Sequence, residues 1–236
     1  MPTFALDTAT ASPSLALVRA DRPTAELWLA PEPGSGRRVL EAAHGLLEAA
    51  GASVRDIGAI VVGVGPGGFT GLRIGIATAL GLGQALGVAV TGASSLEALA
   101  LGIAEVAPAG AVVAPVLDAR RRELFTAAYR ATPDGGLEEL LAPAALAPAD
   151  LRAALRGLGD EVWLGGEGIE AGGDALEGPG LRRPPPGAAA HRVRAAHLAR
   201  RVEAGAGLPA RPVYARLPDA EVNRLAAVAA AAAQPA

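Results

Sequence analysis

The order of its short apolar segments constrains the fold of this 236-residue chain more than any other feature. Three apolar runs, at 3–6, 14–18 and 25–29, are separated by breaks short enough for hairpins. An amphipathic helix is predicted over 39–50, and then strands over 57–64 and 88–90 alternate with helices over 71–86 and 94–104. Hairpins followed by crossover helices predict an α/β fold with a mixed sheet.

The pattern restarts after Pro108 and Gly110. We predict strands over 111–117, 123–129, 137–141 and 161–164, and helices over 148–155 and 191–203, with a Gly/Pro-rich loop at 172–187. Two lobes, 1–106 and 107–236, are the simplest account. The alanine run 226–233 near the end of the chain is predicted to be either a helix or a less ordered tail.

Composition removes several kinds of chemistry. The chain has no cysteine and no lysine, and its 21 basic residues are all arginine. Disulfides, thiolate metal sites, a cysteine nucleophile, a Schiff-base lysine and a P-loop lysine are therefore excluded. The net charge of −3 and the 3% aromatic content disfavour broad nucleic-acid binding. His191 and His197 are six residues apart, not four, and no metal site is predicted.

The sequence also gives expectations about location. The first residues lack the basic and apolar regions of a signal peptide, and the apolar stretch 74–90 is interrupted by Gln84 and glycines. We therefore expect a cytoplasmic protein without a membrane span.

The glycine-rich segment Gly63–Gly71 lies between a predicted strand and a predicted helix. Glycines at such a helix N-terminus can hold an anion with backbone N–H groups, which makes Gly67, Gly68 and Thr70 candidate phosphate contacts. The alternative, at even odds, is that the glycines only form a tight turn and Thr70 caps the helix. A dinucleotide site is not favoured, because the first acidic residue after the loop is Glu97.

An aspartate follows the first strand of each predicted lobe. Asp7 and Thr8 could hold hydrated Mg²⁺ and phosphate oxygens, although an Asx-turn is the favoured interpretation of that segment taken alone. Asp118 and Arg120 occupy the matching turn of the second lobe, where an arginine run could bind an anion or simply be solvated. Their repeated placement favours facing roles across a cleft.

Small residues recur every fourth position in the helix after the glycine loop, at Gly71, Gly75, Ala79 and Gly83. Each interior glycine costs about 0.5–1 kcal/mol relative to alanine, and close packing must offset this cost. The residues that pack against this ridge could come from another chain or from the same lobe, and the two are equally favoured.

Several segments together resemble the TsaB (YeaZ) family. They are residues 5–18, 63–100, 118–129 and 212–220, and the most specific is GPGGFTGLRIG. The resemblance implies a two-lobed actin-like ATPase fold built on ribonuclease-H-like sheets. It also implies a non-catalytic protein that pairs with TsaD, is joined by TsaE, and supports threonylcarbamoyl transfer to adenosine 37 of tRNA.

The resemblance further implies how partners bind. Two helices of the first lobe would contact TsaD or, in its absence, a second copy of the chain. The chain would interact with tRNA only indirectly. The implied interface residues are Val39, Leu46, Leu72, Gly75, Ile76, Ala79, Leu80 and Gly83.

The chain departs from the family pattern at Gly68, where serine is usual, and at Ser35-Gly36-Arg37, where HSE is usual. We therefore expect no required cofactor and at most weak, vestigial binding of ATP or ADP with Mg²⁺. The alternatives are an active ATP-dependent phosphotransferase or metallopeptidase of the actin-like superfamily, and a homodimer with another binding role.

Overall fold

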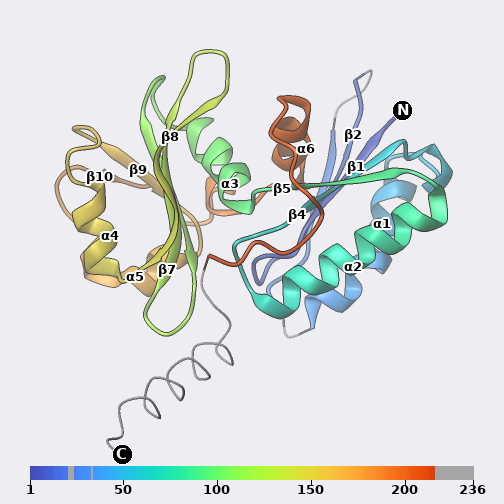
Figure 1. Ribbon diagram of the computed structural model, residues 1–236, viewed down its shortest axis with the longest axis horizontal. Helices are drawn as coiled ribbons and strands as arrows, with labels where there is room; N and C mark the ends of the chain where they lie inside the picture. The colour runs from blue at the N-terminus through green and yellow to red at the C-terminus, as the bar shows by residue number, and fades with distance from the viewer. Residues whose placement is uncertain (21–23, 33, 216–236) are drawn as a thin grey trace, which may run out of the picture.

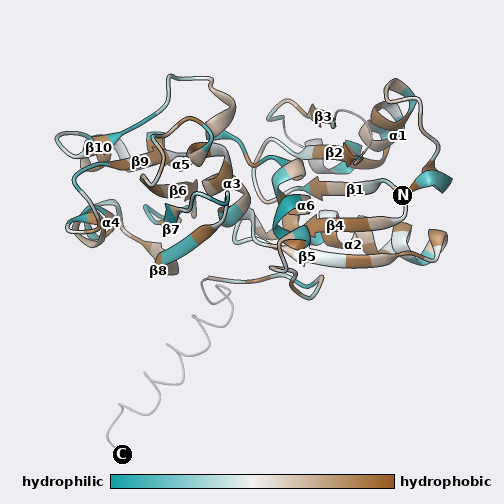
Figure 2. Ribbon diagram, turned by 90° about the horizontal axis from the view of Figure 1, so that it is seen from above, coloured by the Kyte–Doolittle hydropathy of each residue, from teal (hydrophilic) through white to brown (hydrophobic). Residues whose placement is uncertain are grey.

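A computed structural model describes residues 1–20, 24–32 and 34–215. It shows five layers, in the order helices, sheet, helices, sheet, helices (Figure 1). The two sheets lie side by side with α3 and α6 between them (Figure 2). The run 226–233 and the end of the 212–220 segment lie outside the described residues.

The first sheet has the strand order β3-β2-β1-β4-β5. Its first three strands are antiparallel neighbours, and β4 and β5 are parallel to β1, so the predicted mixed sheet is confirmed. The strands are β1 (Thr3–Asp7), β2 (Ser14–Val18), β3 (Ala25–Trp28), β4 (Ala59–Gly63) and β5 (Ala89–Ala93).

The second sheet repeats this topology in the order β10-β9-β6-β7-β8. Its hairpin strands are antiparallel, and β9 and β10 run parallel to β6. The strands are β6 (Val112–Asp118), β7 (Leu124–Ala131), β8 (Leu137–Leu146), β9 (Val162–Gly165) and β10 (Leu181–Arg182). The predicted loop 172–187 therefore contains a short strand and a 3₁₀ turn.

The helices divide among three layers. Helices α1 and α2 cover the outer face of the first sheet, α3 and α6 fill the space between the sheets, and α4 and α5 cover the second sheet. The α-helices are α1 (Val39–Ala49), α2 (Phe69–Leu86), α3 (Ser95–Ala104), α4 (Pro148–Leu155), α5 (Gly168–Gly172) and α6 (Ala195–Glu203). Four 3₁₀ turns span Ser35–Arg38, Val54–Asp56, Gly173–Leu176 and Ala189–His191.

Residue size alternates along β1 and β2 of the first sheet. Phe4 and Leu6 face α1 and α2, whereas Ala5 between them faces the central layer. The same alternation places Ala16 in the central layer. Alanine on this face leaves room for a helix to approach closely, and α6 packs there.

The chain returns to the first lobe near its end. Helix α6 packs on β1, β2, β4 and β5, and Leu208 then forms a β-bridge with Gly92. Residues 195–215 therefore pack mainly on the first sheet, although the sequence assigned all of 107–236 to the second lobe.

Candidate functional site

A cleft of about 590 Å³ lies between the two lobes, where β1 and β6 end. The repeated topology explains this position. β1 and β6 occupy the same place in their sheets, so the turns that follow them lie on the same side of the molecule. Five residues singled out in the sequence line the cleft wall: Thr8, Gly67, Gly68, Asp118 and Arg120.

Asp7 and Thr70, also predicted as contacts, do not line the cleft. Asp7 is 1% exposed and points into the protein beneath β4, where it accepts a hydrogen bond from Ser95 Oγ at 2.5 Å. Its other oxygen accepts from the Ala9 N–H at 2.8 Å, which is the Asx-turn that the segment taken alone predicts. Thr70 is exposed and does not cap α2, whose N-cap is Gly68.

Burial raises the pKa of Asp7, and the hydrogen bonds from Ser95 and Ala9 only partly oppose this effect. A side chain at Gly63 would overlap the Asp7 carboxylate, so the glycine of β4 makes room for it. The carboxylate is therefore a part of the folded core and not a ligand-facing group in this structure.

Asp118 and Arg120 face the cleft as a pair. The Arg120 N–H donates to Asp118 Oδ1 at 2.7 Å, and its guanidinium lies 3.0 Å from Oδ2. Arg120, Arg121 and Arg122 all have positive φ, between 53° and 63°, in the tight turn from β6 to β7. The turn thus places Arg120 against a carboxylate of its own hairpin, which reduces its availability for an anion.

Glu167, which no sequence pattern indicated, borders the cleft and also a second cavity of about 420 Å³. Burial raises the pKa of Glu167, and the nearby Asp118 adds to this, while a hydrogen bond from the Ala11 backbone opposes it. Glu167 follows a glycine pair after β9, and no local pattern in the sequence connects it with the first lobe.

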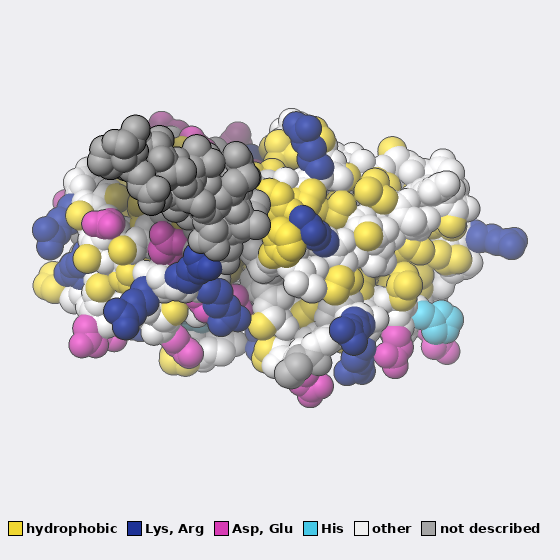
Figure 3. Space-filling view, turned by 60° about the horizontal axis from the view of Figure 1, so that its bottom comes forward, with side chains coloured by type: hydrophobic (Ala, Val, Ile, Leu, Met, Phe, Trp, Pro, Cys, Tyr) yellow, Lys and Arg dark blue, Asp and Glu magenta, His cyan; other side chains and the backbone are white. Residues whose placement is uncertain are grey.

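An aromatic contact forms one rim of the cleft. Tyr214, carried by the returning C-terminal segment, stacks on Phe69 at the start of α2 with ring centroids 5.8 Å apart. The Arg73 guanidinium lies 3.7 Å from the Phe69 ring centroid. Figure 3 shows hydrophobic side chains with arginines among them on this face of the molecule.

The ridge of small residues on α2 packs against its own lobe. A side chain at Gly75 would overlap Thr8 Oγ1, and one at Gly83 would overlap Val90. Gly75, Ala79 and Gly83 are buried, so the idea that the ridge admits a second chain is wrong for this face. Most of the other predicted interface residues are also buried in the first lobe, namely Val39, Leu46, Leu72 and Ile76.

The opposite side of the helix pair is exposed. Leu80 is 47% exposed and Leu40 is 57% exposed, and side chains at Gly45 and Gly81 would meet open space. We call the surface formed by Leu40, Gly45, Ala77, Leu80 and Gly81 the α1–α2 face. Its five residues are exposed and carry apolar side chains or none, and Glu41, His44 and Glu48 are the exposed polar residues of α1.

Among residues 1–20, 24–32 and 34–215, no group of three or more histidine and acidic side chains could hold a metal ion. No helix within the same residues has the length and hydropathy to cross a membrane.

The fold and cleft define a class of protein, the actin-like ATPase fold. Component A of (R)-2-hydroxyglutaryl-CoA dehydratase from Acidaminococcus fermentans has this fold and superposes with a TM-score of 0.50. At 11% identity, covering 84% of this chain and 96% of that one, the likeness concerns the fold alone.

More specific similarities place the chain within that class. A family model described as TsaD, tRNA N6-adenosine threonylcarbamoyltransferase, matches residues 35–154. YeaZ from Pseudomonas aeruginosa superposes with a TM-score of 0.72 at 27% identity, covering 90% of this chain and 100% of that one.

Sequence relatives agree with this placement. The Escherichia coli tRNA threonylcarbamoyladenosine biosynthesis protein TsaB is 33% identical over 77% of this chain and 78% of its own length. Its Bacillus subtilis counterpart is 34% identical over 55% of this chain and 56% of its own length. The chain belongs to the TsaB (YeaZ) family.

Proposed function

We propose that this chain takes part in tRNA threonylcarbamoyladenosine biosynthesis as a non-catalytic partner of TsaD. The printed names of its relatives and the matching family model support the process. We also propose that the chain itself catalyses no reaction. This part of the proposal rests on how the aspartates at the cleft are arranged.

The buried Asp7 is the observation that carries this claim. A carboxylate at the end of β1 could hold hydrated Mg²⁺ only if it faced the cleft, but Asp7 is bonded to Ser95 and Ala9 instead. Asp118, on the opposite lobe, is paired with Arg120. The burial of Asp7 and the pairing of Asp118 with Arg120 support the proposal that the two aspartates do not act together on a metal–phosphate group.

The same arrangement gives our proposal for ligands. The chain requires no cofactor, and its cleft binds ATP or ADP with Mg²⁺ at most weakly. We propose a cytoplasmic location, where the complex with TsaD and TsaE would meet its tRNA substrate.

The α1–α2 face is the surface proposed for the partner. It is apolar, exposed and built on two packed helices, which suits association with another helical surface. TsaD would bind there, TsaE would join the resulting complex, and a second copy of the chain would bind there when TsaD is absent. Contact with tRNA is then indirect.

Reconstitution tests the proposed function. Threonylcarbamoyl transfer from its adenylate to tRNA is measured with purified TsaD and TsaE, with and without this chain. We expect transfer to require the chain, and we expect the chain alone to turn over neither ATP nor peptides. Transfer at the same rate without it, or ATP hydrolysis by the chain alone that Asp7→Ala abolishes, would contradict the proposal.

A surface variant tests the partner face separately. Gly81→Arg places a charged side chain in open space, so it should leave the fold intact and weaken TsaD binding at least tenfold. Ala153→Arg on the exposed side of α4 is the matched control. Sedimentation velocity measures both complexes, and equal binding by the two variants would exclude this face.

A further inference from the structure

The junction between the lobes is built from two helices that touch each other. Helix α3 packs on β6, β7 and β9 of the second sheet, and α6 packs on the first sheet. Helices α3 and α6 also contact each other, so they connect the sheets directly.

One apolar core runs through this junction. It combines Ala5 and Val61 of the first sheet with Leu117 and Tyr129 of the second, and Leu99 of α3 lies among them, all buried. Rotation of one lobe against the other would expose this core to water, which opposes such motion.

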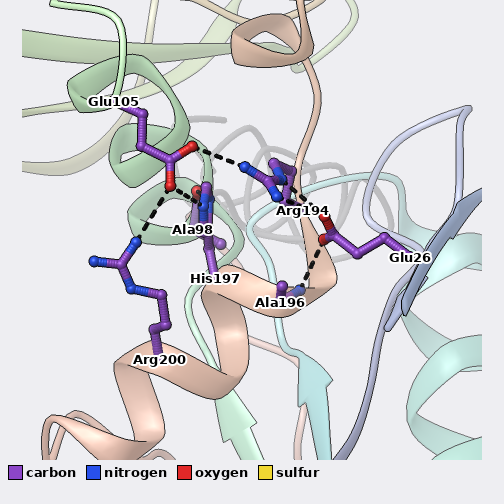
Figure 4. A network of polar contacts seen from close by, with 7 residues as sticks. All are labelled: Glu26, Ala98, Glu105, Arg194, Ala196, His197 and Arg200. Carbon is purple, nitrogen blue, oxygen red and sulfur yellow. Dashed lines mark hydrogen bonds and ion pairs between the residues drawn. The ribbon is translucent and has the colours of Figure 1, made fainter. Parts of the chain in front are cut away.

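A charged cluster closes one end of the same junction (Figure 4). Arg194, just before α6, donates two hydrogen bonds to Glu26 Oε2 of β3, at 3.1 and 2.6 Å. Its remaining terminal nitrogen donates to Glu105 Oε2, at the end of α3, at 2.7 Å. A single guanidinium thus connects the edge strand of the first sheet to the helix that packs on the second.

Two more groups hold Glu105 against α6. Arg200 of α6 donates to Glu105 Oε1 at 3.3 Å. The ring of His197, 1% exposed, lies with Nε2 3.0 Å from the same oxygen and Nδ1 3.0 Å from the Ala98 carbonyl. Separating α3 from α6 would therefore break both contacts that the imidazole makes.

Within this cluster the Glu26–Arg194 pair is more buried than an ordinary surface ion pair, whereas the Glu105 side chain is 43% exposed. The Glu26 side chain is 11% exposed and that of Arg194 is 25% exposed. On the neighbouring turn, Arg201 of α6 also pairs with Glu97 of α3, at 2.6 Å, with side chains 14% and 23% exposed. Ion pairs of this kind fix one arrangement, because either partner left alone is poorly solvated.

We propose that the α3–α6 junction, closed by Arg194 with Glu26 and Glu105, is a fixed joint between the lobes. The cleft then keeps one width whether it is empty or occupied. The chain presents its surfaces as a single rigid body and does not open and close around a nucleotide.

Distances between spin labels on the two lobes test this joint. The chain has no cysteine, so Ala49→Cys on α1 and Ala153→Cys on α4 give one exposed label per lobe without further changes. The labelled chain is diluted with an excess of unlabelled chain, so that distances between copies do not contribute, and we expect a single narrow distance distribution that Mg-ATP leaves unchanged. Two populations, or a shift in the mean distance on adding Mg-ATP, would overturn the proposal.

A pair of charge-removing variants tests the role of Arg194. Arg194→Met keeps the aliphatic stem but removes the link between Glu26 and Glu105, and the distribution should broaden. Arg182→Met removes an arginine that makes two hydrogen bonds to Glu161 within the second lobe, and it should leave the distribution narrow. A distribution that stays narrow with Arg194→Met, or broadens equally with both, shows that the cluster does not hold the joint.

Discussion

Asp7 is the residue whose role depends most on its neighbours. The sequence places it at the end of the first strand, and the structure agrees. Which way its side chain turns is decided by Ser95 and Gly63, which lie 88 and 56 positions away. The sequence therefore predicts where in the fold the aspartate lies. Whether its side chain faces a ligand or the core depends on residues that are distant in the sequence.

Replacing Asp7 gives a prediction for the pH dependence of stability. Because its pKa in the folded chain is raised, the stabilising contribution is complete below the unfolded pKa and is lost as pH rises through the folded pKa. Asp7→Asn stays neutral and can still accept from Ala9 and donate to Ser95. Its free energy of unfolding in urea should equal that of the native chain at acid pH and exceed it at neutral pH.

Asp134 provides a control of opposite sign. Hydrogen bonds from Thr132 and Gly136 lower its pKa, so Asp134 stabilises the fold above the unfolded pKa and that contribution is lost as pH falls. Asp134→Asn should therefore lose stability at neutral pH. An Asp7→Asn variant that is less stable than the native chain at neutral pH would contradict the assignment of Asp7 as a buried group with a raised pKa.

Helix α2 shows what an apolar pattern can and cannot predict at the scale of an element. Its existence and its row of small residues follow from the sequence. Its orientation does not, because both sides of the helix carry glycine or alanine. The side with Gly75 packs on Thr8, and the side with Gly81 faces open space. Only the arrangement of β1 and β5 against the helix distinguishes them.

Two glycine-to-alanine substitutions in this helix should change stability in opposite directions. Gly81→Ala meets no neighbouring atom and should stabilise the chain by about 0.5–1 kcal/mol, because alanine has the higher helix propensity. Gly75→Ala would overlap Thr8 Oγ1 and should destabilise it by about 1–3 kcal/mol. Chemical denaturation measures both variants.

A second substitution tests the cause of the Gly75 effect. Thr8→Ala removes Oγ1 and Cγ2, two of the three atoms that the new methyl group would meet, so it should recover part of the loss in the Gly75→Ala background. If the effects of Thr8→Ala and Gly75→Ala on stability are strictly additive, the contact between α2 and the first hairpin is not the cause of the stability lost with Gly75→Ala.

At the scale of the whole molecule, the repeated order of hairpins and crossovers was enough to predict two α/β lobes with mixed sheets, and the resemblance to the TsaB (YeaZ) family supplied the actin-like class. The return of α6 to the first sheet could not be predicted in the same way. His197 and Leu198 are inward-facing in either arrangement, and nothing in 191–203 says which sheet they meet. The cleft rim formed by Tyr214 was unexpected for the same reason.

The shared core predicts that the two lobes unfold together. Because residues of both sheets contribute to one cluster with α3 and α6, loss of either lobe removes packing from the other. Scanning calorimetry should therefore show one transition, with equal calorimetric and van't Hoff enthalpies. Two resolved transitions would mean that the lobes are independent.

The place of α6 has a consequence for how the chain is made. The first sheet is synthesised early, but the helix that covers its inner face begins at Ala195. On the ribosome, the inner face of the first sheet stays uncovered until the residues of α6 have been translated, more than a hundred residues after β5. A chaperone would meet this face of the first sheet in that interval.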